Sequence, residues 1–274
     1  MNSCKISIIM GIYNCEKTLD EAIQSILCQT YTNWELVMCD DGSEDTTYSI
    51  AEKYAMEYPH KIVLLKNKKN EGLNYTLNKC LHASTGEYVA RMDGDDISLP
   101  TRIEKEIEFL IQHPEYVVVS TPMIMFDENG DWGRTSVIEF PTRNDFCTHT
   151  PFFCHAACMI KKEVFMEVEG YTVDKKLLRV EDCHLWFKIY AKGYKGANLT
   201  EPLYKMRDDR NATNRRSFKA RLNGCYVLYA GFKLVGMPWY KYVYVAKNAI
   251  QELVKCIIPL SVYEYIHKKK FSES

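Results

Sequence analysis

Three carboxylates lie within four residues in the segment Asp93-Gly94-Asp95-Asp96. Carboxylates at this spacing repel one another unless a proton or a cation neutralises part of the charge. Mg²⁺ and Mn²⁺ prefer oxygen ligands, and phosphate groups often complete their coordination. The segment therefore predicts a divalent-cation site beside a phosphate ligand. A polar turn that caps the next helix is the alternative, and the segment alone leaves both interpretations open.

Two further acidic segments have the same ambiguity. Asp40-Asp41-Gly42-Ser43 follows an apolar run and has the composition of a tight turn. Glu181-Asp182 precedes a segment with helical periodicity, where the helix dipole favours a carboxylate and where a general base can face a substrate. Asp40-Asp41 and the Asp93–Asp96 segment both follow predicted strands. Together they are more informative about a ligand site than either is alone.

The elements that must position these residues alternate between strand and helix. Apolar runs predict strands, and apolar residues at helical spacing predict helices between them. The strands are expected at 5–12, 34–39, 62–65, 88–92 and 116–121, and the helices at 16–29, 45–58, 73–83 and 100–113. This order predicts an α/β fold with a mostly parallel sheet and helices on both faces. Ligands of such sheets bind beyond the carboxyl ends of the strands, where both acidic clusters fall.

The second half of the chain is less regular. Residues 123–153 have the turn-rich composition of hairpins and loops. A strand is expected at 157–160, a short helix at 163–168 and a longer helix at 181–192, and the chain reads as helical from about residue 214.

Composition excludes several classes of protein. Lys and Arg number 35 and Asp and Glu number 36 in 274 residues, so no basic excess is available for a nucleic-acid backbone. The N-terminus lacks the pattern of a signal peptide, and no apolar run is long enough to span a bilayer, so we expect a cytoplasmic protein. The eleven cysteines are then expected as reduced thiols. Cys154, His155 and Cys158 lack a second ligand pair, which favours buried small side chains over zinc ligands.

Motifs of other enzyme classes are missing from the sequence. It contains no GxGxxG after the first predicted strand, no GxxxxGK[ST], no HExxH and no GxSxG. Dinucleotide oxidoreductases, P-loop enzymes, zinc proteases and serine hydrolases therefore lose support.

Taken together, seven segments in order resemble glycosyltransferase family 2, whose members are inverting enzymes of GT-A fold. The resemblance runs from Ser7 to about Arg210. The segments are SIIMGIYN at 7–14, QSILCQTYTNWEL at 24–36, CDDGSEDTT at 39–47, NEGLNYTLN at 70–78, TGEYVARMDGDDISLPTRIEKEI at 85–107, HAACMIKKEVFMEVEGY at 155–171 and VEDCHLWFKI at 180–189.

The resemblance implies a GT-A (nucleotide-diphospho-sugar transferase) fold and a metal-dependent reaction with Mn²⁺ or Mg²⁺. It implies that Ile12 and Tyr13 line the base and ribose of the donor, and that Asp41 accepts a hydrogen bond from uracil if the donor is UDP-linked. Asp95 is then the metal ligand, and Asp93 contacts the ribose or the metal through water. Asp96 contacts the sugar or orders the loop.

The same resemblance assigns the acceptor side of the reaction. Asp182 matches the catalytic base, and Glu181 supports it or contacts the acceptor. An inverting transfer needs one base and no covalent nucleophile. Relatives often carry Arg-x-His where this chain has Arg207-Asp208-Asp209-Arg210, so the arginines are either diphosphate ligands or surface residues. His155 matches a position near the acceptor cleft, or it only packs there.

We expect a GT-A domain at 1–213, with a nucleotide-binding half at 1–121 and an acceptor-binding half at 122–213. A C-terminal helical extension is expected at 214–274, where lysines alternate with aromatic and aliphatic residues. This extension either rests on the inner membrane leaflet or forms a helical subdomain that packs on the core or at a homodimer contact.

The sequence therefore predicts a transferase that moves a sugar from a nucleotide-diphosphate sugar, UDP-linked in the favoured case, to a hydroxyl. The expected acceptor is a glycan or a lipid-linked sugar in cell-surface polysaccharide biosynthesis. A non-catalytic nucleotide-sugar-binding subunit is the first alternative. A sugar nucleotidyltransferase is the second, although such enzymes use a Gly-rich loop that the segment Met10-Gly11-Ile12-Tyr13 does not provide.

Overall fold

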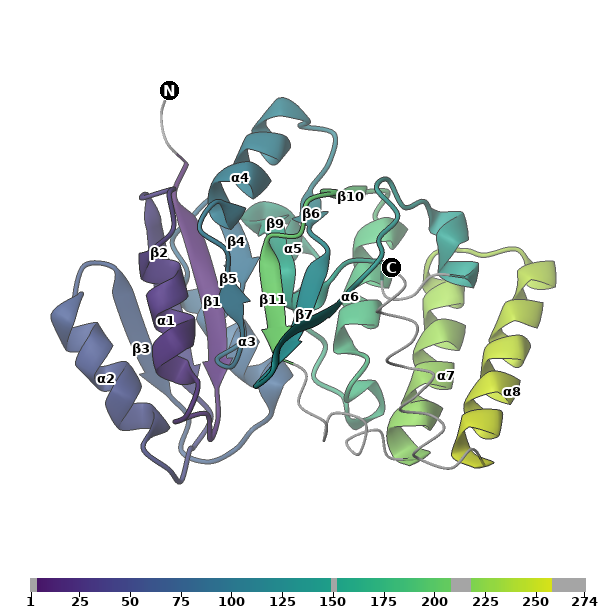
Figure 1. Cartoon of the computed structure of the whole chain (residues 1–274). Coiled ribbons are helices and arrows are strands. Elements are labelled where there is room, and N and C mark those ends of the chain that lie inside the picture. Colours follow the sequence, from purple (N-terminus) through teal and green to yellow (C-terminus); the bar gives the residue numbers. More distant parts are fainter. Residues whose placement is uncertain (1–3, 149–151, 208–217, 258–274) are drawn as a thin grey trace.

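A computed structural model describes residues 4–148, 152–207 and 218–257 of the chain (Figure 1). Its centre is a seven-stranded sheet with the strand order β10-β6-β9-β4-β1-β2-β3. The strands are β1 (Ile6–Ile12), β2 (Trp34–Asp40), β3 (Ile62–Lys66), β4 (Tyr88–Arg91), β6 (Val118–Ser120), β9 (Cys158–Lys161) and β10 (Gly196–Asn198).

This sheet confirms the predicted mostly parallel α/β architecture. Strand β1 pairs in parallel with both β2 and β4, and β10 pairs in parallel with β6. Strand β9 is the exception, because it runs antiparallel to both of its neighbours, β4 and β6. Because β9 and β10 come from the second half of the chain, the two predicted halves share one sheet.

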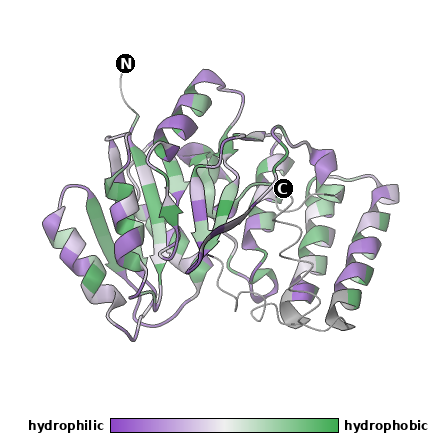
Figure 2. Cartoon of the chain, in the orientation of Figure 1, coloured by the Kyte–Doolittle hydropathy of each residue, from purple (hydrophilic) through white to green (hydrophobic). Residues whose placement is uncertain are grey.

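Helices cover both faces of the sheet, and the alternation of apolar residues along β1 explains why. Ile8 and Met10 point into a core beneath α1 (Leu19–Leu27), α2 (Thr47–Glu57) and α4 (Arg102–Gln112). Ile9 points into the opposite core beneath α3 (Leu73–Ala83), α5 (Lys162–Glu167) and α6 (Glu181–Ala191). Figure 2 shows the resulting pattern, with hydrophobic residues concentrated in the central strands and hydrophobic and hydrophilic residues alternating along the helices.

A second, four-stranded sheet lies beside the carboxyl end of β4. Its order is β5 (Ile97–Ser98), β11 (Tyr204–Arg207), β7 (Met123–Asp127) and β8 (Gly130–Arg134). The predicted hairpin region thus contains the β7–β8 pair, whereas the two-residue strand β5 was not predicted from the sequence. The β5–β11 pairing brings the end of the family-like region against the Asp93–Asp96 loop.

The helices that follow residue 217 are α7 (Phe218–Leu234), the 3-10 helix η5 (Trp239–Tyr242) and α8 (Val243–Ile257). They lie within the segment 214–274 for which the sequence predicts a helical extension; the rest of that segment lies outside the described residues. Helix α7 packs against α6, and its Leu228 and Phe232 belong to the same core as Phe187 of α6. In the described part of the chain, no helix combines the length and hydropathy needed to cross a bilayer.

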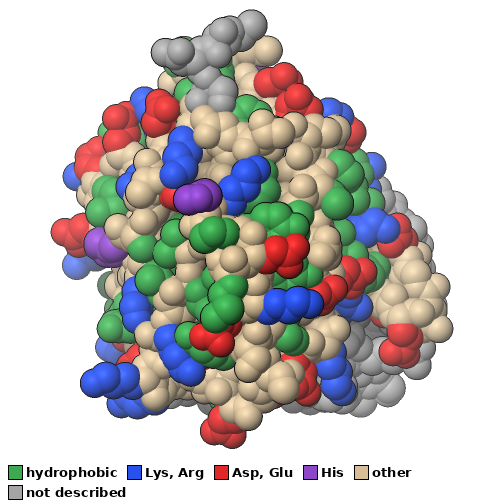
Figure 3. All heavy atoms as spheres, turned by 90° about the vertical axis from the view of Figure 1, so that its left-hand side faces the viewer, with side chains coloured by type: hydrophobic (Ala, Val, Ile, Leu, Met, Phe, Trp, Pro, Cys, Tyr) green, Lys and Arg blue, Asp and Glu red, His purple; other side chains and the backbone are tan. Residues whose placement is uncertain are grey.

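The face formed by α2 and β3 shows how charge is distributed on one side of the molecule. In Figure 3, Lys and Arg side chains on this face are interspersed with Asp and Glu. Such mixing matches the near-zero net charge of the chain.

Candidate active site

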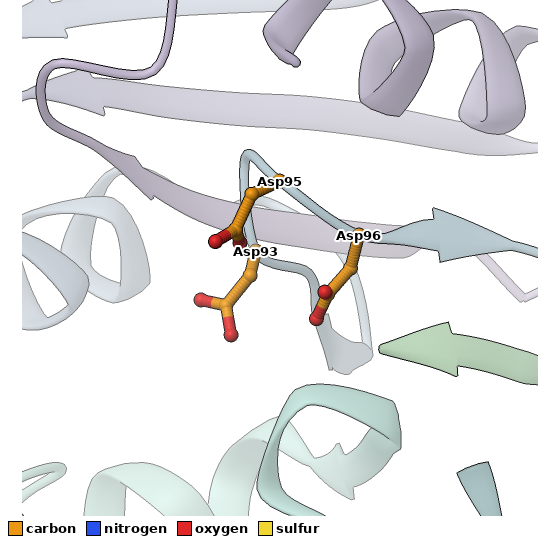
Figure 4. A group of neighbouring side chains, drawn as sticks. All are labelled: Asp93, Asp95 and Asp96. Atoms are coloured by element: carbon orange, nitrogen blue, oxygen red, sulfur yellow. The ribbon is translucent and has the colours of Figure 1, made fainter. Parts of the chain in front are cut away.

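The acidic cluster occupies the loop between β4 and β5. One carboxylate oxygen from each of Asp93, Asp95 and Asp96 lies within 4.8 Å of the other two (Figure 4). Asp93 and Asp95 are partly exposed, whereas Asp96 is buried. An all-oxygen donor set at this spacing fits a hard divalent cation such as Mg²⁺ or Mn²⁺.

Asp96 binds the neighbouring strand β11. Its Oδ1 accepts a hydrogen bond of 2.8 Å from the backbone N–H of Arg207. Burial, followed by the charges of Asp93 and Asp95, raises the pKa of Asp96 well above its usual value. The Asp93 N–H also donates to the Tyr204 hydroxyl at 3.2 Å. Strand β11 therefore fixes the acidic loop at two points.

Arg207 lies directly against this loop. Its Nε donates to the Asp95 carbonyl at 3.0 Å, and its Nη2 forms an ion pair of 2.5 Å with Glu21. The guanidinium also lies 4.4 Å from the centre of the Phe126 ring. The structure thus brings Arg207 to the predicted metal site, while Arg210 lies outside the described residues.

Arg91, the last residue of β4, was not predicted as a site residue. It is buried, and its Nη2 contacts Asp93 Oδ1 at 2.5 Å. Within the described residues its Nε has no hydrogen-bond partner. Its positive charge lowers the pKa values of both Asp182 and His155. Arg91 therefore couples the acidic loop electrostatically to the region around Asp182.

Asp182 lies in the first turn of α6 and is partly buried. Burial and then the negative charge of Glu181 raise its pKa to about 6, against smaller opposing effects of the Cys183 N–H and Arg91. Its Oδ1 accepts a hydrogen bond of 2.7 Å from the Cys183 N–H. A carboxylate with this pKa is ionised at neutral pH yet basic enough to accept a proton.

His155 and two aromatic residues lie close to this base. The His155 Nε2 lies 2.8 Å from the Tyr171 hydroxyl, and its ring meets the Trp186 ring edge-on at 6.2 Å. Burial and the charge of Arg91 hold the pKa of His155 well below its usual value, which keeps the ring neutral. Burial raises the pKa of the Tyr171 hydroxyl well above its usual value, and the charges of Glu181 and Asp182 add smaller effects in the same direction.

Two thiols lie near His155, of which Cys158 is buried and Cys154 is partly buried. Cys158 donates to the His155 carbonyl at 3.1 Å, and Cys154 contacts the Thr135 hydroxyl at 3.6 Å. Burial raises the pKa of Cys154 to about 11 and that of Cys158 to about 12. Both side chains are therefore protonated at neutral pH.

The third predicted group lies at the ends of β1 and β2. Asp41 accepts hydrogen bonds from the Asn67 side chain at 2.8 Å and from the N–H groups of Glu71 and Gly72 at 2.9 Å. Both of its oxygens therefore hold the loop that begins α3. Ile12 is buried in the core, and its carbonyl accepts from the Asp41 N–H at 2.9 Å, whereas Tyr13 is 43% exposed.

Sequence comparison identifies the family. Residues 7–169, more than half of the chain, match the family described as glycosyl transferase family 2. The chain belongs to this family. It is 42% identical to EpsE of Bacillus subtilis over 97% of this chain and 94% of that protein. The amylovoran biosynthesis glycosyltransferase AmsE of Erwinia amylovora is 32% identical over 77% of this chain and 79% of that protein.

Solved structures establish the fold of this glycosyltransferase as GT-A. Staphylococcus aureus TarS in complex with UDP-GlcNAc superposes with a TM-score of 0.68 at 19% identity, covering 91% of this chain and 71% of TarS. The mannosyltransferase PcManGT of Pyrobaculum calidifontis, in complex with GDP-Man and Mn²⁺, gives 0.64 at 18% identity and covers 96% and 79% of the two chains. The GT-A fold expected from the sequence is therefore confirmed.

Within this glycosyltransferase the predicted residues form three groups. Asp93, Asp95 and Asp96 meet Arg207 at the β4–β5 loop. Glu181 and Asp182 lie in the first turn of α6, where the charge of Arg91 acts on Asp182. A third group lies at the ends of β1 and β2. The signal that identifies Arg91 in the sequence is its place two residues before Asp93, at the end of a strand.

Proposed function

We propose that this glycosyltransferase is an inverting, metal-dependent enzyme that transfers a sugar from a UDP-linked donor to a hydroxyl group. One observation carries the proposal. Asp182, whose pKa is raised to about 6, lies within the electrostatic influence of the same buried arginine, Arg91, that forms an ion pair with Asp93 of the carboxylate cluster. The proposed general base and the proposed cation site thus share the influence of a single positive charge.

On the donor side, Asp95 is the proposed ligand of Mn²⁺ or Mg²⁺, with Asp93 at the ribose or at a water of the metal. A cation bound there would stabilise the negative charge that grows on the leaving nucleoside diphosphate. Arg207 lies against the same loop and supplies a guanidinium for the diphosphate. Asp96, hydrogen-bonded to β11, orders the loop or reaches the donor sugar.

The nucleotide is proposed to lie at the ends of β1 and β2. The exposed Tyr13 ring offers a surface for the base or ribose, and the buried Ile12 sets its position. Asp41, already hydrogen-bonded to the loop at 67–72, would share its carboxylate with the ring N–H of uracil. Binding of UDP-GlcNAc by TarS supports uridine, whereas GDP-Man in PcManGT makes guanosine the alternative base.

On the acceptor side, Asp182 takes the proton from the attacking hydroxyl. The oxygen then displaces the nucleoside diphosphate from the opposite face of the anomeric carbon, and one such displacement inverts that centre. Glu181 raises the pKa of Asp182 or contacts the acceptor. His155, held neutral against Tyr171, is available as a hydrogen-bonding group for an acceptor hydroxyl.

The acceptor is proposed to be a growing glycan, carried on a lipid, in cell-surface polysaccharide biosynthesis at the cytoplasmic side of the membrane. The name of one relative supports a lipid-linked acceptor. WfaP of Escherichia coli, 29% identical over 73% of this chain and 77% of its own length, is named a UDP-Glc:α-D-GlcNAc-diphosphoundecaprenol β-1,3-glucosyltransferase. AmsE supports the polysaccharide class.

Thermal unfolding with a panel of UDP- and GDP-sugars, each with and without Mn²⁺, tests this proposal. A ligand at 100 times its Kd stabilises the folded state by about 2.7 kcal/mol, which raises the melting temperature measurably. We expect a shift with at least one UDP-sugar plus Mn²⁺, and its loss in Asp95→Asn. The matched variant Asp131→Asn, at an exposed carboxylate of β8, should keep the shift. No shift with any UDP-sugar would exclude the UDP assignment.

A further inference from the structure

The outer face of η5 and α8 presents apolar side chains to solvent. Trp239 is 85% exposed and Tyr240 is also exposed in η5, and Val243, Ile250 and Val254 are exposed along α8. Exposed apolar residues that occur singly are normal, but a contiguous set marks an interaction surface.

The spacing of these residues places them on one side of α8. Val243, Ala246, Ile250 and Val254 follow one another at intervals of three or four residues, which is one helical face. Tyr244, Val245, Asn248 and Ala249 are less exposed, and α8 packs against α7. In Figure 1, α8 forms the edge of the molecule, with α7 between it and α6. The apolar face of α8 therefore points away from the catalytic domain.

Charge on this element is positive. From residue 233 to residue 255 the chain has four lysines and one carboxylate, Glu252. Glu252 pairs with Arg221 of α7 at 3.1 Å, which directs its carboxylate toward α7 rather than outward. Lys247 is exposed on α8 between Val243 and Ile250. The outer face thus combines apolar residues with a lysine, and its one nearby carboxylate is neutralised.

We propose that this face, Trp239 and Tyr240 with the outer residues of α8, binds the surface of a membrane that contains anionic lipids. Trp and Tyr are enriched at the level of lipid headgroups, and lysines are attracted to anionic lipid. A second copy of the chain fits less well, because lysine is depleted from the centre of protein interfaces, where Lys247 would lie. The purpose of this contact rests on the proposed function, since a lipid-linked acceptor requires an enzyme held at the bilayer.

Vesicle cosedimentation of the full chain tests the proposal. The probes are vesicles of phosphatidylcholine alone and of phosphatidylcholine with 30% phosphatidylglycerol, at low and high salt. We expect binding to the anionic vesicles that weakens with salt. The double variant Trp239→Ser, Ile250→Ser should reduce the bound fraction at least tenfold. The control Met56→Ser, Ile111→Ser removes exposed apolar residues from α2 and α4 and should bind like the wild type.

Three outcomes overturn the proposal. In the first, the wild type stays in the supernatant with anionic vesicles at low salt. In the second, the Trp239, Ile250 variant binds the vesicles as well as the control variant does. In the third, sedimentation equilibrium finds that the wild type is a dimer and that this variant is a monomer, which assigns the face to a second copy of the chain. Stabilisation by UDP-sugar and Mn²⁺, measured without vesicles, should be unchanged in the variant. Failure of the donor assay in the wild type concerns the proposed function, whereas failure of vesicle binding concerns this face.

Discussion

Asp182 is the residue on which turnover should depend most directly. Replacing it with asparagine keeps the size of the side chain and removes its ability to accept a proton. We expect Asp182→Asn to lose roughly 10²–10⁴-fold in turnover, the usual contribution of a general base. Nucleoside diphosphate release measures the loss. Stabilisation by donor and Mn²⁺ should persist, and unchanged turnover would mean that another residue acts as the base.

Glu181 should set the pH at which Asp182 becomes active. A base works when deprotonated, so with a pKa of about 6 the rate should rise as the pH increases through 6 and level off above it. Because the charge of Glu181 raises the pKa of Asp182, Glu181→Gln should move this rise to lower pH. The kcat–pH profile measures the shift, and Glu108→Gln, on the exposed side of α4, is the control. If the profile did not move, the group whose titration controls the rate would not be Asp182.

The acidic residues of the candidate site could be selected from the sequence because each belongs to a local pattern. Asp93 and Asp95 follow a predicted strand, and Asp182 begins a predicted helix, so a local pattern places each of them. Arg91 was missed because an arginine at a strand end usually faces solvent. Its burial depends on contacts that join distant segments, such as Arg102 of α4, whose Nη1 donates to the Arg91 carbonyl at 3.1 Å.

At the scale of elements, periodicity predicted the first half of the fold well. Strands of five to seven residues, β1 to β3, and the helices between them carry enough apolar repeats to be recognised. Strand β9 could be predicted as a strand but not as an antiparallel one, since its partners β4 and β6 are chosen by tertiary packing. The two residues of β5 are too few to show a periodic pattern, and their partners Tyr204 and Lys205 lie more than 100 residues away.

Helix α7 illustrates how a single glycine sets the approach of two elements. A Cβ atom at Gly231 would clash with the Phe187 ring of α6, which is fully buried and stacked on Phe146. We expect Gly231→Ala to destabilise the protein by about 1–3 kcal/mol, the usual cost of overpacking a core. Urea unfolding at equilibrium measures the change.

Gly224 gives a matched control for this prediction on the same helix. A Cβ atom there would meet nothing within 4 Å. Gly224→Ala should therefore stabilise the protein slightly, by about 0.5–1 kcal/mol, because alanine favours a helix over glycine. If both variants changed stability equally, the close contact between Gly231 and Phe187 would not govern the packing of α7 on α6.

The molecule as a whole has a carboxylate with a raised pKa at one end of the strands of its main sheet and a carboxylate with a lowered pKa at the other end. At the carboxyl edge of β4, Asp96 is crowded by Asp93 and Asp95, and its pKa is raised. At the amino edge, Glu35 of β2 accepts hydrogen bonds from Lys5, Ser7 and Thr85, and these lower its pKa to about 2 against the cost of burial. The first group lies at the proposed binding site, whereas the second stabilises the ionised form of Glu35 in the folded state.

Acid sensitivity of the fold should therefore arise at Glu35. Its pKa is lowered on folding, so its contribution to stability is full above pH 4.5 and is lost as the pH falls toward 2. The shift corresponds to about 3 kcal/mol at neutral pH. We expect Glu35→Gln to lower the unfolding free energy at pH 7 by an amount of this order, and the difference from wild type to shrink progressively below pH 4.5.

Urea unfolding between pH 7 and pH 2 measures this difference, with Glu128→Gln in the β7–β8 turn as an exposed control. A difference that stayed constant with pH would mean that Glu35 stabilises the sheet edge by packing rather than by its charge.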